Sequence, residues 1–225
     1  MHTIRKLHNN VKRDLISMVA KGDVLDIGCG RGGDLSKFKH CHEVSSVYMW
    51  DPDPDMVMEA RKRSETLDIN NVYFGVGDIT KCPEETFDSI CFNFSLQYIF
   101  KTEKLFQKSI FEIQKRMKKG GILFGCIPDS FKIITMTPLN DSYGNSVIRK
   151  IQESGNGHFG EKVFVKLDSP YYDNEYKAEP IAYKDYLIDE LSKYSIFLKE
   201  WSTLTNDINC PQITKLYAKF IFVKI

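Results

Sequence analysis

Short apolar runs alternate with polar, helix-compatible stretches along the first 127 residues of the chain. Runs of this length, rich in branched and aromatic residues and bounded by turn residues, are typical of buried strands. On this pattern we predict strands at residues 24–27, 46–50, 72–74, 87–92 and 122–124. The first of these strands leads directly into a run of glycines.

Two helices are predicted between the later strands. Asp53 and Pro54 are a typical N-cap and first-turn pair, so a helix is expected over 56–63. Thr102 can cap a second helix, which the glycine pair at 120–121 should end. The apolar positions of this second helix follow the spacing of one helix face: Leu105, Phe106, Ile110, Ile113 and Met117. Strands that alternate with helices favour a doubly wound, mostly parallel α/β sheet.

The pattern changes after residue 127. Residues 128–177 are polar and rich in turn residues. We interpret 128–180 as an insertion over the carboxyl ends of the strands, where open α/β sheets bind ligands. A second domain is the alternative. A helix is predicted over 183–194 and a strand over 216–224. The expected organisation is one domain over 1–225, divided into an amino-terminal segment, a core, the insertion and a carboxyl-terminal part, at 1–20, 21–127, 128–180 and 181–225.

Composition is that of a globular protein and limits the partners of the chain. Of its 225 residues 42% are hydrophobic and 27% are charged, which excludes a disordered chain. The net charge is +1, so any contact with nucleic acid must come from local patches. One such patch lacks acidic residues and holds Arg5, Lys6, Lys12 and Arg13. No apolar run reaches the about 18 residues of a membrane span.

The six cysteines indicate a reducing environment. No two of them are spaced as Cys-x-x-Cys, and none has a histidine pair at zinc-site spacing, so no metal site is expected. Several lie inside apolar stretches, which is typical of free, buried thiols. The amino terminus is too polar for a signal peptide, and a cytoplasmic protein is therefore expected.

The glycine run after the first strand carries the most information about ligands. Gly28, Gly30 and Gly33 match G-x-G-x-x-G between a predicted strand and a predicted helix. The same glycine pattern could also form a tight strand-to-helix turn that binds no ligand. With a ligand, two classes compete: a dinucleotide, with its pyrophosphate on the loop, and S-adenosylmethionine (SAM), which has no phosphate. Asp51, which lies 18 residues after Gly33, suits the ribose of either one.

Acidic residues at the strand ends favour SAM over a dinucleotide. Asp26 comes two residues before Gly28, where a carboxylate would repel a pyrophosphate but attract the ammonium and sulfonium of SAM. Asp78 follows the third strand and supplies a further acceptor, suited to an adenine amino group. Three carboxylates at successive strand ends therefore predict a SAM site.

The loop also carries a family resemblance. Residues 26–35, Asp-Ile-Gly-Cys-Gly-Arg-Gly-Gly-Asp-Leu, resemble the D-L-G-C-G-K-G-G-D-L of mRNA cap guanine-N7 methyltransferases. Further segments resemble that family's F-N-N-x-x-K, Q-F-S-x-H-Y-x-F and G-G…P-x-S segments, at 8–12, 93–100 and 120–130. Weaker likenesses lie at 179–180 and 216–220. In its short length the chain is most similar to the methyltransferase domain of the multifunctional capping enzymes of large cytoplasmic DNA viruses.

The resemblance implies a Rossmann-like, seven-stranded-type class I methyltransferase fold, with SAM as cofactor and the capped 5′ end of RNA as partner. It assigns to SAM the residues Lys12, Asp26, Gly28, Gly30, Asp51, Asp78, Asn93 and Phe94. It assigns to the cap guanosine the residues Asn9, Phe94, Gln97, Tyr98, Pro128, Glu179 and Tyr217. It also suggests, as partners, other capping-enzyme domains or a stimulatory subunit, and a location in the host cytoplasm or the virion.

Two positions depart from the family pattern. Gln97 stands where the family usually has histidine, and Asn93 replaces a usual glutamine. Glutamine can still form a hydrogen bond with a guanine edge, but it cannot become cationic. Both positions belong to the segment that should hold the base, so the way the base is held is expected to differ.

Methyl transfer to guanine N7 needs no general base, because that nitrogen has a free lone pair and no proton to lose. We therefore expect no catalytic acid or base, and a rate that changes little between pH ~7 and ~9. Phe94 and Tyr98, four residues apart, could clamp a purine, and Glu179 could accept from guanine N1–H and the 2-amino group. Two alternatives stay open: a methyltransferase for another nucleophile, and a non-catalytic subunit that binds cap or SAM.

Overall fold

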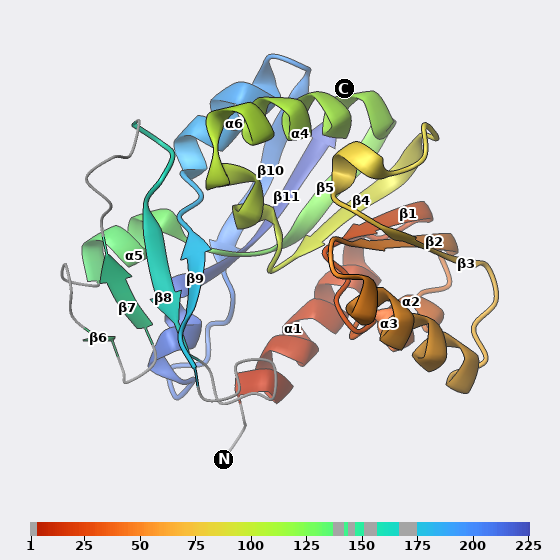
Figure 1. The fold of residues 1–225 in the computed structure, drawn as a ribbon, viewed down its shortest axis with the longest axis horizontal. Coiled ribbons are helices and arrows are strands. Elements are labelled where there is room, and N and C mark those ends of the chain that lie inside the picture. Colours follow the sequence, from red (N-terminus) through yellow and green to blue (C-terminus); the bar gives the residue numbers. More distant parts are fainter. Residues whose placement is uncertain (1–3, 137–141, 144–146, 151–156, 167–174) are drawn as a thin grey trace.

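The computed structural model describes residues 4–136, 142–143, 147–150, 157–166 and 175–225. Within these residues the centre of the molecule is a seven-stranded sheet with the order β10-β11-β5-β4-β1-β2-β3 (Figure 1). Its strands are β1 Gly22–Ile27, β2 Val44–Asp51, β3 Val72–Val76, β4 Phe87–Asn93, β5 Met117–Pro128, β10 Ile196–Thr203 and β11 Tyr217–Lys224. Pairing is parallel from β3 to β5, and only β11 runs antiparallel to its two neighbours.

Helices cover both faces of this sheet (Figure 1). One face packs against α4 Glu103–Arg116 and α6 Lys184–Ser192, through side chains such as Phe106 and Leu187. The other face packs against α1 Ile4–Val19 and α2 Leu35–Lys39, through Leu15 and Phe38. Strand residues alternate between the two cores, as the two-residue period of a strand requires, with Val24 on one side and Leu25 on the other. The expected doubly wound, mostly parallel sheet is confirmed.

Local sequence explains where several elements begin. Asp53 caps α3 Pro54–Thr66 by accepting from the backbone N–H groups of Asp55 and Met56. Thr102 caps α4 by accepting from Leu105 N at 3.2 Å. Both predicted caps are confirmed, and every predicted strand has its counterpart in the sheet.

One predicted helix end is wrong. The helix that starts after Thr102 ends at Arg116, and Met117 already pairs with Phe87 as the first residue of β5. The glycine pair at 120–121 therefore lies inside a strand instead of ending the helix. Gly120 has a φ of +73°, and the pairing of β4 with β5 is irregular just after Phe87, so these glycines shape a bend in the strand.

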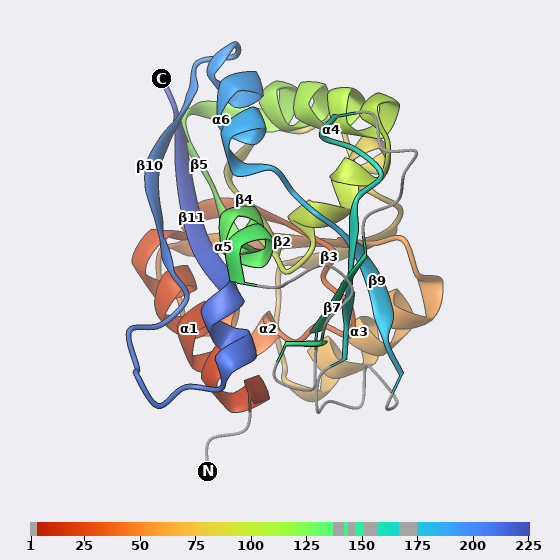
Figure 2. The ribbon, with the colours of Figure 1, turned by 90° about the vertical axis from the view of Figure 1, so that its left-hand side faces the viewer.

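The segment between β5 and α6 contributes a small second layer. It holds α5 Ser130–Met136 and an antiparallel sheet of four strands in the described residues, in the order β6-β7-β8-β9 (Figure 2). These strands are β6 Ser142–Tyr143, β7 Val147–Lys150, β8 Lys162–Val165 and β9 Lys177–Pro180. The last strand, β9, packs against the short helix η2 Leu96–Lys101, which directly follows β4. The insertion thereby reaches the carboxyl end of the central sheet.

The oxidation state of the cysteines and the character of the helices complete the description of the fold. All six cysteines are free, and five of them are buried. Among the helices of the described residues, none combines the length and the apolar character that a membrane crossing requires.

Candidate active site

Glycines give the loop between β1 and α2 a left-handed backbone. Gly28 has a φ of +75° and Gly30 a φ of +52°, a region that other residues rarely adopt. A Cβ on Gly28 would lie 2.4 Å from the Cβ of Ser95, whereas a Cβ on Gly30 would meet no atom within 4 Å. Gly28 N donates to Trp50 O at 2.7 Å, and Gly30 N donates to Asp51 Oδ2 at 2.8 Å. The loop is thus fixed to the end of β2, with open space beside Gly30.

Asp26 places a buried carboxyl group at the tip of β1. Its side chain is 1% exposed, and its Oδ2 has no hydrogen-bond partner among the described residues. Burial, with a further contribution from the negative charge of Asp34, raises the pKa of Asp26 to about 8, although Lys12 opposes the shift. A buried carboxyl oxygen without a partner is a feature that a cationic ligand would satisfy.

A second buried carboxylate, Asp34, joins three elements beneath the loop. It forms ion pairs with Lys12 of α1 and Lys37 of α2, each at 2.7 Å, and accepts from Asn93 Nδ2 of β4 at 2.9 Å. Burial alone would raise the pKa of Asp34, but the two lysines hold it at about 2. Burial would likewise lower the pKa of Lys12, yet Asp34 keeps it above its ordinary value. Asp34 and Lys12 therefore stay charged at neutral pH, whereas burial lowers the pKa of Lys37.

Two further carboxylates end the neighbouring strands. Asp51 is the last residue of β2, and its Oδ1 accepts from Asp53 N at 3.0 Å. Asp78 follows β3, and its Oδ1 accepts from Thr80 N at 2.9 Å and from the Thr80 hydroxyl at 2.6 Å. Both are half-buried. Together with Asp26 they form an acidic row across the carboxyl ends of three adjacent strands.

Phe94 begins the second half of the site, where β4 ends. Its φ of +61° is unusual for a bulky residue, and its N–H donates to Cys126 O of β5 at 2.7 Å. Its ring stacks on His8, with centroids 5.1 Å apart, and meets Tyr217 edge to face at 5.3 Å. The chain thus turns sharply after Asn93, and an aromatic cluster follows directly on the Asp34 network.

Gln97 and Glu179 form a buried polar pair next to this cluster. Gln97 Nε2 donates to Phe94 O at 3.0 Å and to Glu179 Oε2 at 3.1 Å, and the two side chains are 1% and 4% exposed. Tyr217 is buried too, and burial together with Glu179 raises its pKa well above the ordinary value. The η2 helix and β9, distant in sequence, therefore meet at one polar site.

The remaining predicted residues lie around these two clusters. Pro128 ends β5 and pairs with Tyr217 in the sheet. Asn9 is half-buried on α1, next to His8 and one turn before Lys12. Tyr98 is half-buried on η2, and the Lys101 ammonium lies 5.3 Å from the centre of its ring. The ring of Phe94 contacts the rings of His8 on α1 and Tyr217 on β11. The expected clamp of a purine between Phe94 and Tyr98 stays a prediction.

Sequence reasoning did not find His8, Asp34 or Lys37 as parts of the site. His8 stacks on Phe94, and its Nε2 lies 3.1 Å from Thr214 Oγ1. Burial, then Lys12, lowers the pKa of His8 to about 4, so its ring is neutral at physiological pH. The available signal was the helical spacing of His8 and Lys12, which places both on one face of α1.

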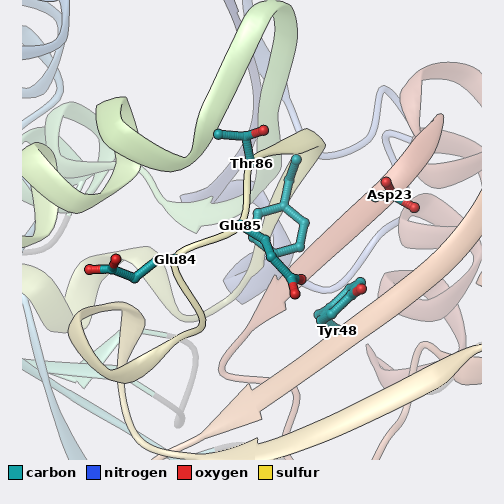
Figure 3. A pocket seen from close by; sticks show the side chains of 6 residues that line it. Asp23, Tyr48, Glu84, Glu85 and Thr86 are labelled. Carbon is teal, nitrogen blue, oxygen red and sulfur yellow. The ribbon is translucent and has the colours of Figure 1, made fainter.

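A separate cavity lies at the opposite end of the central sheet (Figure 3). It is lined by Asp23 at the start of β1, by Tyr48 of β2 and by Glu84 and Glu85 before β4. Asp26 and the glycine loop lie at the other end of β1, so this cavity is not part of the site. Within the described part of the chain, no group of three or more His, Cys, Asp and Glu side chains could hold a metal ion.

A protein family described as a methyltransferase domain matches residues 19–165. The chain belongs to this family. The mRNA cap guanine-N(7) methyltransferases of Saccharomyces cerevisiae and Eremothecium gossypii are 31% and 29% identical to this methyltransferase, each over 75% of its length. It spans 42% and 43% of those two relatives, so it matches less than half of either protein.

Solved structures confirm the fold of the methyltransferase. An S-adenosylmethionine-dependent methyltransferase from Clostridium acetobutylicum superposes with a TM-score of 0.66 at 15% identity, over 97% of this chain and 91% of that one. The fold is therefore that of class I SAM-dependent methyltransferases, as the glycine loop and the seven-stranded sheet indicate.

Proposed function

We propose that this methyltransferase transfers a methyl group from SAM to N7 of the guanosine that caps the 5′ end of RNA. The observation that carries the proposal is the continuity of two sites at the end of β4. Asn93 faces the charged network under the glycine loop, and the next residue, Phe94, opens the aromatic and polar cluster with Glu179. A methyl donor and a flat purine would thus lie side by side.

The residues of the first site fit SAM. The Oδ2 of Asp26 has no partner in the described chain, and it would accept the ammonium of the donor. Asp51 and Asp78 stand at the next two strand ends and suit a ribose and an adenine amino group. Gly30 leaves open space where a ligand can approach the backbone. SAM supplies an electrophilic methyl group on its sulfonium, and these residues would orient it.

The residues of the second site fit guanine. Glu179 is a buried acceptor, suited to guanine N1–H and the 2-amino group, and adenine offers no such pair of donors. Phe94 and Tyr217 present aromatic surface beside it. Relatives that cover three quarters of the chain are named cap guanine-N(7) methyltransferases, which supports this acceptor over other nucleophiles.

Positioning accounts for the proposed catalysis. Guanine N7 carries a lone pair and loses no proton, so the protein has to align two reactants and exclude water. Well-oriented reactants gain effective molarities of about 10⁵–10⁸ M. His8, which belongs to the aromatic cluster, is kept neutral by burial and stacks on Phe94, and we assign it no role as a base.

The test is a methyl-transfer assay with purified protein and radiolabelled SAM. The substrates are RNA with an unmethylated cap, the same RNA with a 5′ triphosphate, free GTP and a transfer RNA. We expect label only on capped RNA, and nuclease digestion should release 7-methylguanosine. Label on another acceptor would favour a different nucleophile. Binding of SAM and cap without transfer would favour a non-catalytic subunit.

Wider assignments are part of the same proposal. The resemblance to viral capping enzymes supports a place beside other capping domains, a stimulatory partner and a cytoplasmic location. The chain matches less than half of each of the two relatives named above, which is consistent with additional domains in such systems. Adding candidate partner domains to the transfer assay would show whether any of them raises the rate.

A further inference from the structure

We propose that Gln97 recognises the 2-amino group of the cap guanine through its amide oxygen, as a specificity residue next to Glu179. This inference rests on the proposed function, because it names the atom that distinguishes that substrate's base. Gln97 lies on η2 directly beside β9, and 1% of its side chain is exposed. A buried amide beside a carboxylate has few arrangements open to it.

The orientation of the Gln97 amide follows from its neighbours. Its nitrogen lies 3.0 Å from Phe94 O and 3.1 Å from Glu179 Oε2, and both of these atoms are acceptors. The reversed amide would place an oxygen against a carbonyl and a carboxylate, which repel it. Both N–H bonds of the amide are therefore used within the protein.

The amide oxygen is what remains for a ligand. Gln97 Oε1 is buried, and none of the described residues donates a hydrogen bond to it. A buried acceptor without a donor raises the free energy of the protein, so a ligand N–H placed there is favoured. The site thus presents two acceptors, Gln97 Oε1 and the Glu179 carboxylate, from two different elements.

Guanine offers two polar groups to a residue in this position, and only one fits. Its O6 is an acceptor, and Gln97 has no N–H left to donate to it. An amide oxygen beside O6 would repel it. The 2-amino group has two N–H donors, so Glu179 and Gln97 can share it. Gln97 therefore selects for the amino group. The histidine that the family usually has at this position could, by contrast, also donate a hydrogen bond.

The test compares a guanosine cap with an inosine cap, which lacks only the 2-amino group. Dissociation constants of GpppA and IpppA are measured by fluorescence quenching with S-adenosylhomocysteine present. We expect the wild-type protein to bind GpppA at least about tenfold more tightly, and Gln97→Met to reduce this ratio by about fivefold to tenfold. The variant should lose affinity for GpppA and keep its affinity for IpppA, whereas a misfolded protein would lose both.

A matched control makes the same chemical change elsewhere. Gln107 of α4 donates to the hydroxyl of Tyr186 at 3.3 Å, and Gln107→Met should leave the ratio unchanged. An unchanged ratio in Gln97→Met, in a protein that still binds S-adenosylhomocysteine, would overturn the role of Gln97. The proposed function would survive that result, because it fails only if the wild-type protein does not methylate capped RNA.

A second measurement does not depend on any variant folding. In wild-type protein labelled with ¹³C at the glutamine side-chain carbonyls, GpppA should shift one resonance that IpppA leaves in place. Gln97→Met, if it folds, assigns that resonance by its loss. Equal shifts with both caps, or none with either, would contradict a hydrogen bond from the 2-amino group.

Discussion

Asp26 shows how one buried side chain couples donor binding to pH. Its pKa of about 8 lies well above that of an exposed carboxyl group, because burial and Asp34 disfavour its charged form. Below pH 8 the group is mostly protonated, and a cationic donor must displace that proton to pair with the carboxylate. Binding at neutral pH should therefore release a proton, and the free energy of binding should become more favourable as pH rises.

We predict that the affinity of the protein for SAM rises by up to about tenfold per pH unit from pH 6 to 8 and then levels off. Calorimetry in buffers of different ionisation enthalpy would measure both the affinity and the released proton. Asp26→Asn should bind weakly and show no such slope. At saturating SAM the turnover number should stay nearly flat from pH ~7 to ~9, since no general base takes part. A donor affinity that falls as pH rises would contradict the role of Asp26.

Phe94 makes a second prediction at the scale of single residues. Its ring contacts His8 and Tyr217 next to the buried Glu179, and under the proposed function it would also stack on the cap guanine. Phe94→Leu keeps an apolar side chain but removes the aromatic face. We expect cap affinity to fall by about tenfold or more, since stacking contributes ~1–3 kcal/mol per base, with SAM affinity changed less. Parallel titrations with GpppA and S-adenosylhomocysteine would test this, and an equal loss of both would indicate a structural role.

At single positions, the chemical character of the site could be predicted from the sequence, but the contacts between its residues could not. The carboxylates at strand ends followed from spacing, because parallel strands end at the same edge of a sheet. Asp34 was missed because an acidic residue at the start of a helix is usually solvated, and only folding brings Lys12 and Asn93 to it. His8 was missed for a similar reason, because its partners Phe94 and Thr214 are distant in sequence.

Among the elements, the glycine loop permits a matched pair of substitutions. Gly28→Ala and Gly30→Ala both force alanine into a left-handed backbone, which costs about 1–2 kcal/mol each. Only the Gly28 variant also drives a Cβ to 2.4 Å from Ser95, so it should lose about 3 kcal/mol or more of unfolding free energy in urea. Gly30→Ala should lose less stability but still lose donor affinity, since its new methyl group occupies the open side of the loop. Similar stabilities for the two variants would argue against this loop geometry.

The ion pairs and the hydrogen bond of Asp34 join α1, α2 and β4, so we expect them to contribute to the free energy of unfolding. Asp34→Asn leaves Lys12 and Lys37 without their shared carboxylate in a buried place. Removing one member of a buried ion pair costs about 3–5 kcal/mol, so we expect a loss of that size in unfolding free energy. Arg13→Ala, at an exposed position on the same helix, is the control and should change stability by less than about 0.5 kcal/mol. A small effect of Asp34→Asn would show that the network does not join these elements.

Prediction of elements succeeded where hydrophobic runs were long enough to leave a signal. The strands β1, β4 and β5 contain runs of consecutive buried residues, so both of their faces are covered and they read as apolar runs. The strands β6 to β9 have only two to four residues each, which is too short for a period to show, and the segment therefore read as turn-rich. α1 was not predicted because most of its residues are polar, and it is ordered by its packing on the sheet through Leu15 and Ile16.

The charge of the whole molecule limits how it can hold RNA. Basic and acidic residues number 31 and 30, and the half-buried Lys12 of the amino-terminal basic patch is paired with Asp34. The pair removes one of the expected phosphate contacts, so recognition should depend on the cap more than on the RNA backbone. Each phosphate neutralised on a single strand contributes about −0.7 to the slope of log affinity against log salt.

We therefore predict a shallow salt dependence, with a slope no steeper than about −3, corresponding to about four phosphates or fewer. Fluorescence anisotropy with capped RNAs of five and twenty nucleotides, between 50 and 300 mM salt, would measure it. The two RNAs should bind with affinities within about threefold of each other. Lys104→Gln together with Lys108→Gln, on exposed positions of α4, should leave the slope within about one unit of wild type. A slope near −7, or one that steepens with RNA length, would instead reveal an extended basic track for the transcript.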